Sequence, residues 1–526
     1  MSIPASATTI GDVFRHWAKA TPAKIALKTL HGVNQSFAQL NENINRLTNS
    51  LLALGVRKGD RVAILSRNSE HYIETYGLAK AGLVVVPLNW RLQPEELVRL
   101  IDHSAAVAVL VEEHFKEAGK LLHSMSSGVN HWIRIGEAKD GWLSYQELLR
   151  SGSPEDVDIA VSEKDPLCII YTSGTTGLPK GVSISHAGAL CNARVAADEM
   201  LQMVHEDVTL AVMPMFHVGG MWYHCFPSIA SGCSTLILNE FNPAAVLKAL
   251  VDYRISNVHL VPTMIAALIK QPEAKSIDLS HVRLIFYAAS SMPPTLLKEA
   301  MQVFSSCGFA QAYGSTEGGV VTVLDPAAHL RAKTALGEHL LGSCGRPMRD
   351  RAVRIVDDDE RSVSFGSVGE IEVRSPGLMS GYWNDEVKTR QAVHGGWLKT
   401  GDMGYFDGEG FLYIVDRRND MIVTGGENVF PTEVEAVLYE DADIQEVAVF
   451  GIPDPKWVET VVAAVVLKAG SRVSGEEIQK RLKAKIASYK CPKDIYIVEQ
   501  LPKSAVGKVL RKDLKSKFAP SGATAK

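Results

Sequence analysis

Between Leu40 and Phe304 the chain alternates short apolar runs with segments whose hydrophobic residues recur at the helical period. The apolar runs fall well short of the roughly 18 residues that a membrane span needs, and they have the length of buried strands. This alternation predicts α/β layers with parallel strands, because a parallel connection needs a crossover. The predicted strands are 61–65, 83–86, 107–111, 167–171, 208–213, 235–238, 257–261 and 284–287, and the predicted helices are 40–54, 70–80, 94–103, 187–203, 243–252 and 294–304.

The pattern changes from about Leu341, where glycine and proline become frequent and the apolar positions begin to alternate. Short alternating strands at 353–356, 370–374 and 411–415 predict antiparallel, barrel-like pairing. At roughly 150 residues per domain, 526 residues suggest three or four domains or subdomains.

Composition excludes several classes of protein. The 55 Lys and Arg residues nearly balance the 59 Asp and Glu residues, for a net charge of −4, so we expect no nucleic-acid partner. The seven cysteines form no C-x-x-C pair and no zinc-finger spacing, which predicts reduced thiols. Because the N-terminal residues lack the pattern of a signal peptide and no run could span a membrane, we expect a cytoplasmic protein. For the oligomeric state, the sequence is compatible with both a monomer and a homodimer.

A glycine-rich segment follows the predicted strand 167–171. Residues 172–181 hold three glycines, four hydroxyl side chains and Lys180 before a helical pattern resumes near Ala187. Glycine lets backbone N–H groups approach an anion closely, and the hydroxyls and the lysine add donors, so this composition is typical of a phosphate cradle. It is not the P-loop of kinases, because Pro179 precedes the lysine and Gly181 follows it.

With this segment and five further strings in order, the chain resembles the AMP-forming acyl-CoA synthetases, relatives of luciferases and of peptide-synthetase adenylation domains. The likeness runs from about Thr9 to Lys512. The further strings are Met213–His217, Gln311–Glu317, Gly396–Asp402, Asp416–Asn428 and Leu501–Lys508.

The resemblance implies a two-step reaction. A carboxylate attacks the α-phosphorus of MgATP to give an acyl-adenylate and pyrophosphate, and the thiol of coenzyme A then displaces AMP. It also implies an α/β fold with a large N-terminal domain, residues 1–415, made of two layered α/β subdomains and a small β-barrel-like subdomain. A small mobile α+β domain, residues 416–526, follows as a lid.

The family's ATP site maps onto residues of this chain through the shared strings. By the resemblance, Thr316 contacts the α-phosphate, Glu317 and Thr172 hold Mg²⁺, and Tyr313 stacks on adenine. Asp402 binds both ribose hydroxyls, and Arg417 supports the ribose or the phosphate. The other expected ATP-binding residues are Ser173, Gly174, Thr175, Thr176 and Lys180 of the phosphate loop, and Ala289, Ser290 and Gln311 near adenine.

Two further residues match the family's catalytic groups. Lys508 matches a lysine that enters the active site for adenylation, where a cation stabilises the charge that develops between the carboxylate and the α-phosphate. His217 matches a histidine that borders the carboxylate pocket. Without the string that contains it, His217 would read as an ordinary core histidine.

The mobility of the lid also rests on the resemblance. Asp416 matches the hinge residue, and Gly425 and Gly426 match the turn beside the coenzyme A tunnel, where the absence of side chains admits a slim pantetheine arm. One position departs from the pattern: many relatives have a lysine where this chain has Asn419. Arg418 is the neighbour that could compensate.

The expected acyl pocket is apolar and lacks a cation, which predicts a hydrophobic monocarboxylic acid. A medium- or long-chain fatty acid is favoured, and an aryl or alicyclic acid is the alternative. Loading of a free carrier protein in place of coenzyme A is a second alternative. The pocket residues that the resemblance implies are Val218, Gly219, Met221, Trp222, Gly318 and Val320.

Overall fold

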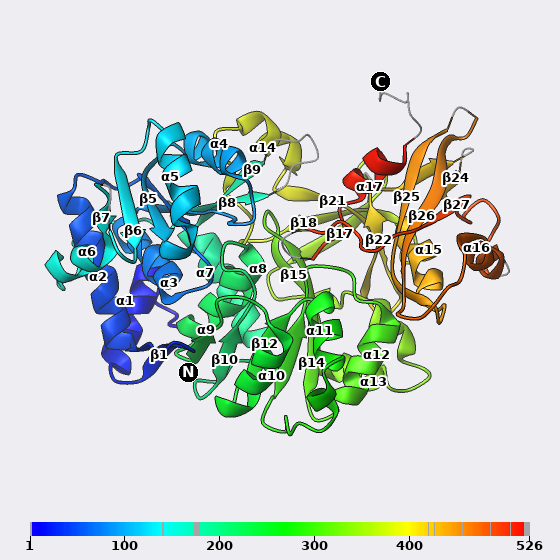
Figure 1. Cartoon of the computed structure of the whole chain (residues 1–526), viewed down its shortest axis with the longest axis horizontal. Coiled ribbons are helices and arrows are strands. Elements are labelled where there is room, and N and C mark those ends of the chain that lie inside the picture. The colour runs from blue at the N-terminus through cyan, green and yellow to red at the C-terminus, as the bar shows by residue number, and fades with distance from the viewer. Residues whose placement is uncertain are drawn as a thin grey trace.

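The computed structural model describes residues 3–138, 141–172, 179–418, 420–424, 427–454, 456–483, 485–504 and 507–519. These residues form four β-sheets. Figure 1 shows two of the sheets in the upper left and lower parts of the molecule, with the other two and the C-terminal helices on the right.

The first sheet has the strand order β19-β9-β8-β4-β3-β5-β6-β7. Its strands from β8 to β7 are parallel, whereas β9 pairs antiparallel with both β8 and β19. The strands are β3 (Arg61–Leu65), β4 (Val84–Pro87), β5 (Ala106–Glu112), β6 (His131–Ile135), β7 (Leu143–Ser144), β8 (Pro166–Thr172), β9 (Lys180–Ser185) and β19 (Gly381–Tyr382).

The second sheet has the order β16-β15-β14-β13-β12-β10-β11-β1-β2. It is parallel from β14 to β1 and closes with antiparallel strands at both edges. The strands are β1 (Ile25–Thr29), β2 (Asn34–Ser36), β10 (Val208–Ala211), β11 (Ser234–Ile237), β12 (Asn257–Leu260), β13 (Leu284–Tyr287), β14 (Gly308–Ser315), β15 (Gly319–Leu324) and β16 (Arg346–Pro347).

The third sheet is antiparallel, as the alternating pattern after Leu341 predicts, and runs β17-β18-β21-β20 with β22 on β21. The fourth sheet, near the C-terminus, runs β24-β23-β26-β25 with β27 on β26. The strands are β17 (Ala352–Val356), β18 (Gly369–Arg374), β20 (Val393–His394), β21 (Trp397–Phe406), β22 (Leu412–Arg417), β23 (Ile422–Thr424), β24 (Glu427–Val429), β25 (Ile444–Asp454), β26 (Val458–Leu467) and β27 (Asp494–Ile497).

Helices cover the faces of these sheets (Figure 1), and several begin at a side chain that caps them. Ser185, for example, accepts a hydrogen bond from the backbone N–H of Gly188 at the start of α7. The helices are α1 (Ile10–Ala20), α2 (Phe37–Ala53), α3 (Glu70–Gly77), α4 (Pro94–Ser104), α5 (Lys116–Met125), α6 (Tyr145–Ser151), α7 (His186–Val195), α8 (Val218–Gly220), α9 (Phe226–Ala230), α10 (Pro243–Asp252), α11 (Pro262–Ile269), α12 (Pro294–Val303), α13 (Pro326–Arg331), α14 (Glu386–Ala392), α15 (Pro431–Leu438), α16 (Gly475–Lys483) and α17 (Arg511–Phe518); π-helical turns follow α7 at Ala196–Met200 and α8 at Met221–Cys225.

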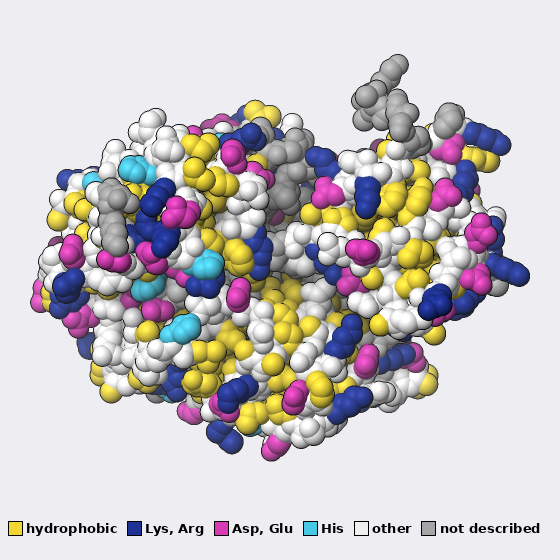
Figure 2. All heavy atoms as spheres, viewed as in Figure 1, with side chains coloured by type: hydrophobic (Ala, Val, Ile, Leu, Met, Phe, Trp, Pro, Cys, Tyr) yellow, Lys and Arg dark blue, Asp and Glu magenta, His cyan; other side chains and the backbone are white. Residues whose placement is uncertain are grey.

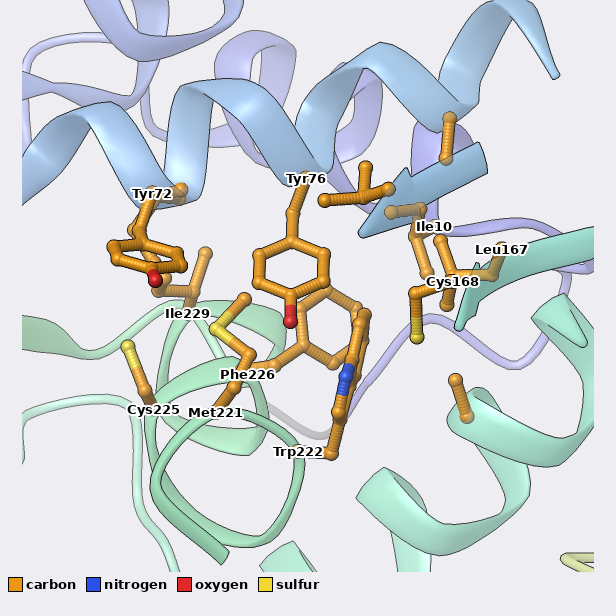
Figure 3. Packing of buried hydrophobic residues seen from close by; sticks show 14 of the residues in the cluster. Ile10, Tyr72, Tyr76, Leu167, Cys168, Met221, Trp222, Cys225, Phe226 and Ile229 are labelled. Carbon is orange, nitrogen blue, oxygen red and sulfur yellow. The ribbon is translucent and has the colours of Figure 1, made fainter. Parts of the chain in front are cut away.

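The two large sheets share one hydrophobic core. Its buried side chains include Ile64 of β3 and Phe286 of β13, so the two layered units are fused and not merely tethered. Figure 3 shows part of it, where Tyr76 of α3 points toward Trp222 of the second π-helical turn and Tyr72 lies beside Ile229. The C-terminal sheet instead packs around cores of its own, on both faces of β25 and β26.

The α/β fold predicted from the sequence is thus confirmed. Each of the seven cysteines is a free thiol, as expected. None of the helices in the described part of the chain is long and apolar enough to cross a membrane.

Three buried histidines give the fold a predictable response to acid. Burial lowers the pKa values of His186, His224 and His329 to about 4, whereas an unfolded histidine binds its proton near pH 6.5. Between these values the unfolded chain binds more protons than the folded chain, so the free energy of unfolding falls as the pH drops from 6.5 toward 4. Each histidine lowers the free energy of unfolding by on the order of 2–3 kcal/mol over that pH range. Asp416, with a pKa raised to about 6 mainly by burial, opposes this in part.

We therefore expect the urea midpoint of unfolding to decrease clearly between pH 7 and pH 5. His329→Gln should make this pH dependence less steep, because residue 329 no longer titrates and unfolding then takes up about one proton fewer. A midpoint that stays constant over this range, or a slope unchanged in the variant, would contradict the interpretation.

Candidate active site

Several predicted site residues converge near the carboxyl ends of β13 and β14, where the large body meets the C-terminal part. Open α/β sheets bind ligands at this edge of the strands. Figure 2 shows the surface hollowed where these parts of the molecule meet.

Asp402 organises one wall of the site. It lies on β21 directly opposite Arg417 on β22. One carboxylate oxygen accepts from Nε of Arg417 at 2.7 Å, and the other accepts from the hydroxyl of Tyr313 at 2.6 Å. Because Asp402 and Tyr313 are buried, this arrangement is held rigidly. The structure thus brings together three residues that the sequence places far apart.

Glu317 and Lys180 meet at a second wall. Tyr382 donates its hydroxyl to Glu317 Oε1 at 3.2 Å, and the ammonium of Lys180 lies 5.0 Å from the centre of the Tyr382 ring. Thr172 pairs with Lys180 across β8 and β9, so the phosphate-loop segment connects these two strands. Its predicted residues Ser173, Gly174, Thr175 and Thr176 lie outside the described residues.

Lys508 of the C-terminal part reaches this site. Its ammonium interacts electrostatically with Arg417, Asp402 and Glu317. The residue as a whole remains exposed, yet protein atoms around the ammonium displace water and lower its pKa; Arg417 adds to this effect, while the two carboxylates oppose it.

The neighbouring glycine explains how Lys508 is positioned. Gly507 has φ of +78°, and a Cβ there would come within 3.0 Å of the Thr263 hydroxyl at the start of α11. A residue without a side chain therefore lets the loop pack against the large body.

His217 is neutral in this setting. Burial and the nearby Lys508 lower its pKa to about 4. Its Nδ1 accepts a hydrogen bond from the backbone N–H of Gly219 at 3.3 Å, so the ring proton is on Nε2. Gly219 in turn accepts at its carbonyl from Nδ1 of the buried His259 at 3.2 Å. The ring is thus oriented through Gly219.

The predicted adenine residues lie around the ends of β13 and β14. Ala289 follows β13 with φ of +75°, a conformation that alanine rarely adopts and that often occurs at functional sites. Gln311 on β14 has a buried Oε1 with no hydrogen-bond partner among the described residues. Ser290 is next to Ala289 and half-buried.

Asp416, the predicted hinge residue, connects the body to the C-terminal part. It lies buried on β22, and its carboxylate accepts from the backbone N–H of Thr432 on α15 at 3.0 Å and from that of Arg417 at 2.7 Å. A hydroxyl bond from Thr432 to the carbonyl of Val415 reinforces the junction.

The residues predicted for the acyl pocket lie around a small cavity, but only two of them line it. Val218 and Trp222 line a small cavity of about 10 Å³, room for about one water molecule. Met221 is in the core beneath, Gly219 lies between His217 and His259, and Gly318 lies beside Ser315 and Leu398; none of these three lines the cavity. Val320 is behind its wall. The cavity is completed by Ile184, Ala189, Asn192, Tyr223, Thr316, Gly377 and Met379.

The residues predicted for coenzyme A, Gly425 and Gly426, and the departure at Asn419 lie outside the described residues. Arg418, the neighbour considered for compensation, pairs with Asp358 at 2.6 Å and with Glu370 at 2.8 Å. It is therefore held by other partners.

Sequence reasoning missed Tyr382, Asn192, Met379 and Arg351. Tyr382 links Glu317 to Lys180, and the other three lie at or behind the cavity. They fall outside the recognisable strings, and only the folded chain brings them to the site.

Comparisons with known proteins agree with this geometry. A family model described as AMP-binding enzyme matches residues 14–383, and one described as AMP-binding enzyme C-terminal domain matches residues 433–508. An indoleacetate–CoA ligase from Aromatoleum aromaticum is 36% identical over 486 residues, or 92% of this chain and 93% of that protein. A long-chain-fatty-acid–CoA ligase from Mycobacterium tuberculosis is 33% identical over 517 residues, covering 97% and 98%. The solved structure of an anthranilate CoA ligase with anthranoyl-AMP has a TM-score of 0.89 at 27% identity and covers 98% of each chain.

The chain belongs to the AMP-binding enzyme family, within the adenylate-forming superfamily. The resemblance seen in the sequence is thereby confirmed. The protein is an AMP-forming acid–CoA ligase, which uses ATP, a carboxylic acid and coenzyme A.

Proposed function

We propose that the acid is a compact aromatic carboxylic acid, activated to its adenylate and then transferred to coenzyme A. The observation that carries this is the small cavity beside Thr316 and Val218, next to His217 and Glu317. Any acid must widen it, but a single ring requires a much smaller rearrangement than an extended chain, because protein cores are densely packed.

The wall of the cavity supports a short pocket. Trp222 lines the cavity and packs edge-on against Tyr76 at 5.1 Å and in a tilted arrangement against Phe226 at 5.0 Å, measured between ring centres. All three side chains are essentially inaccessible to solvent (Figure 3). A long alkyl chain would have to separate this aromatic cluster.

The relatives' names include both classes of acid. Indoleacetate and anthranilate are aromatic, whereas the mycobacterial ligase is named for long-chain fatty acids. The fatty-acid preference inferred from the sequence is untested, and the cavity favours its aryl alternative.

In this proposal the two walls bind the nucleotide. Asp402 accepts from the ribose hydroxyls, Tyr313 stacks on adenine, and Gln311 offers its unpartnered oxygen to the adenine amino group. Lys180 and Thr172 contact the phosphates at the base of the loop. Thr316 contacts the α-phosphate.

Glu317 fits a magnesium site. Its Oε1 accepts from Tyr382, and its other oxygen has no protein donor among the described residues. The described residues contain no cluster of three or more His, Cys, Asp or Glu side chains that could bind a metal. A cation here would therefore share Glu317 and Thr172 with phosphate oxygens and water, as Mg²⁺ prefers, and would neutralise phosphate charge.

The first step brings an anion to a polyanion, so charge neutralisation is the main task. Lys508 neutralises charge between the carboxylate and the α-phosphate, and His217 donates from Nε2 to a carboxylate oxygen. For the second step, residues 416–526 rotate about Asp416 and bring Gly425 and Gly426 to the site.

The test is pyrophosphate release with MgATP across aromatic, alicyclic and C4–C16 fatty acids, followed by thioester formation with coenzyme A or a carrier protein. We expect aromatic acids to exceed C12–C16 acids at least about tenfold in kcat/KM. A long-chain acid as the best substrate would refute the aromatic assignment. Transfer of the acyl group to a carrier protein but not to coenzyme A would refute coenzyme A as the acceptor.

A further inference from the structure

Asn192 is the one amide side chain that lines the cavity in the described part of the chain. It lies on α7 and is 5% exposed. A Cβ on Gly319 or on Gly377 would come within 2.3 Å and 2.4 Å, respectively, of its Oδ1, so these glycines leave it just enough room. The amide is therefore tightly confined.

Arg351 determines which way this amide faces. Its Nη2 donates to Asn192 Oδ1 at 3.0 Å, and the backbone N–H of Val320 donates to the same oxygen at 3.3 Å. With Oδ1 bound to two donors, Nδ2 must face the other way, where it donates to the carbonyl of Gly377 at 2.8 Å. The second N–H of Asn192 has no acceptor among the described residues.

Arg351 is itself unusual, because it is 6% exposed and makes no ion pair with any described carboxylate. Its other acceptors are the carbonyls of Val320 and Arg349 and the sulfur of Cys191. The acidic residues of the adjacent π-helical turn, Asp198 and Glu199, pair with Arg349 instead. A buried cation without a counter-ion is costly, and its field makes the cavity beside Asn192 electropositive.

We propose that Asn192, oriented by Arg351, determines specificity by donating a hydrogen bond to an oxygen substituent of the acid. This inference rests on the proposed aromatic acid and deepens it: the substrate is a ring acid bearing a hydroxyl, alkoxy, keto or second carboxylate oxygen away from the reacting carboxylate. The cavity supports this direction of hydrogen bonding. The Tyr223 hydroxyl is already donated to the carbonyl of Ser315 at 2.6 Å, and no carboxylate lines the cavity.

Arg351 is a positioning residue in this scheme, because it acts through Asn192 and does not touch the substrate. Its guanidinium fixes the amide orientation and strengthens the donor by polarising the amide. Sequence reasoning placed no cation near the acyl group, because Arg351 is far from the pocket strings and only the fold brings it behind Asn192.

The experiment compares matched acids that differ only in one substituent, methyl against hydroxyl and ethyl against methoxy, at each ring position. Pyrophosphate release gives kcat/KM for each pair. We expect the wild type to prefer the oxygen-bearing member about 3- to 10-fold at one ring position, the effect of one hydrogen bond between neutral groups. Asn192→Leu should reduce this ratio to within about twofold of unity, and Arg351→Met should reduce it partly.

Met379→Leu is the matched control, because it alters the same cavity without changing a polar group. It should change kcat/KM by the same factor for both acids of a pair. Because a single variant leaves a buried polar group unpaired, the double variant Asn192→Leu/Arg351→Met removes both partners, keeps the fold and should lack the preference. Thermal melting checks folding.

A wild-type ratio near unity with efficient turnover of plain aromatic acids would overturn this inference and leave the proposed function standing. Retention of the preference in the double variant would overturn it too. If no aromatic acid, substituted or not, supports pyrophosphate release, the proposed function itself is overturned.

Discussion

Lys508→Ala should lower the rate of acyl-adenylate formation by about 10²- to 10³-fold and leave thioester formation from supplied acyl-adenylate nearly unchanged. The ammonium interacts with Asp402, Glu317 and Arg417, where charge develops as the carboxylate meets the α-phosphorus. Single-turnover measurements of adenylate formation and of adenylate consumption separate the two steps.

Lys512→Ala is the control for this variant. Lys512 lies four residues further along, on α17, and is exposed. It has the same charge but no partner in the site, so its removal should change either rate by less than about twofold. Equal losses in both half-reactions of Lys508→Ala would contradict the assignment, as would a comparable loss in Lys512→Ala.

Several residues assigned from the ordered strings lie together in the structure, while their roles stay predictions. Asp402, Tyr313 and Lys508 were assigned because each occurs in a string that resembles the family's, and not because a local structural pattern marks them. Asp402 and Tyr313 lie within β21 and β14. The strands that the sequence analysis predicted lie within one or two residues of the observed ones, and β3 and β13 agree at both ends, because their apolar runs are buried on both faces. Other strands, among them β1, β6, β9 and β15, were not predicted.

The lining of the small cavity could be predicted only in part. Val218 and Trp222 were expected by the resemblance, but Asn192 comes from α7 and Met379 from the segment before β19. Such a surface depends on how distant elements pack, and no local pattern reports it. Arg351 shows the limit most clearly: in the sequence it is one basic residue in a basic turn, and only burial without a counter-ion marks it out.

Asp416→Pro tests the hinge. Because Lys508 lies near Asp402 and Glu317, the structure has the arrangement that the proposed mechanism assigns to adenylation. Proline fixes φ near −65° at residue 416 and restricts Val415 as well, which should prevent the backbone rotation that the second step requires. We expect thioester formation to fall about 100-fold, the cost of a misplaced catalytic group, while adenylate formation stays within about tenfold of the wild type.

Two further substitutions separate rotation from local structure. Asp416→Ala removes the acceptor for the N–H of Thr432 but leaves φ free, and Asp416→Asn keeps an acceptor while removing a carboxyl whose pKa burial raises to about 6. Both should form thioester at rates within about tenfold of the wild type. If Asp416→Ala is as slow as the proline variant, the residue acts by capping α15 and not as a hinge. If the proline variant forms thioester at the normal rate, the domain does not rotate about this residue. Rotation about φ of residue 416, which proline prevents, would then not be needed for the second step.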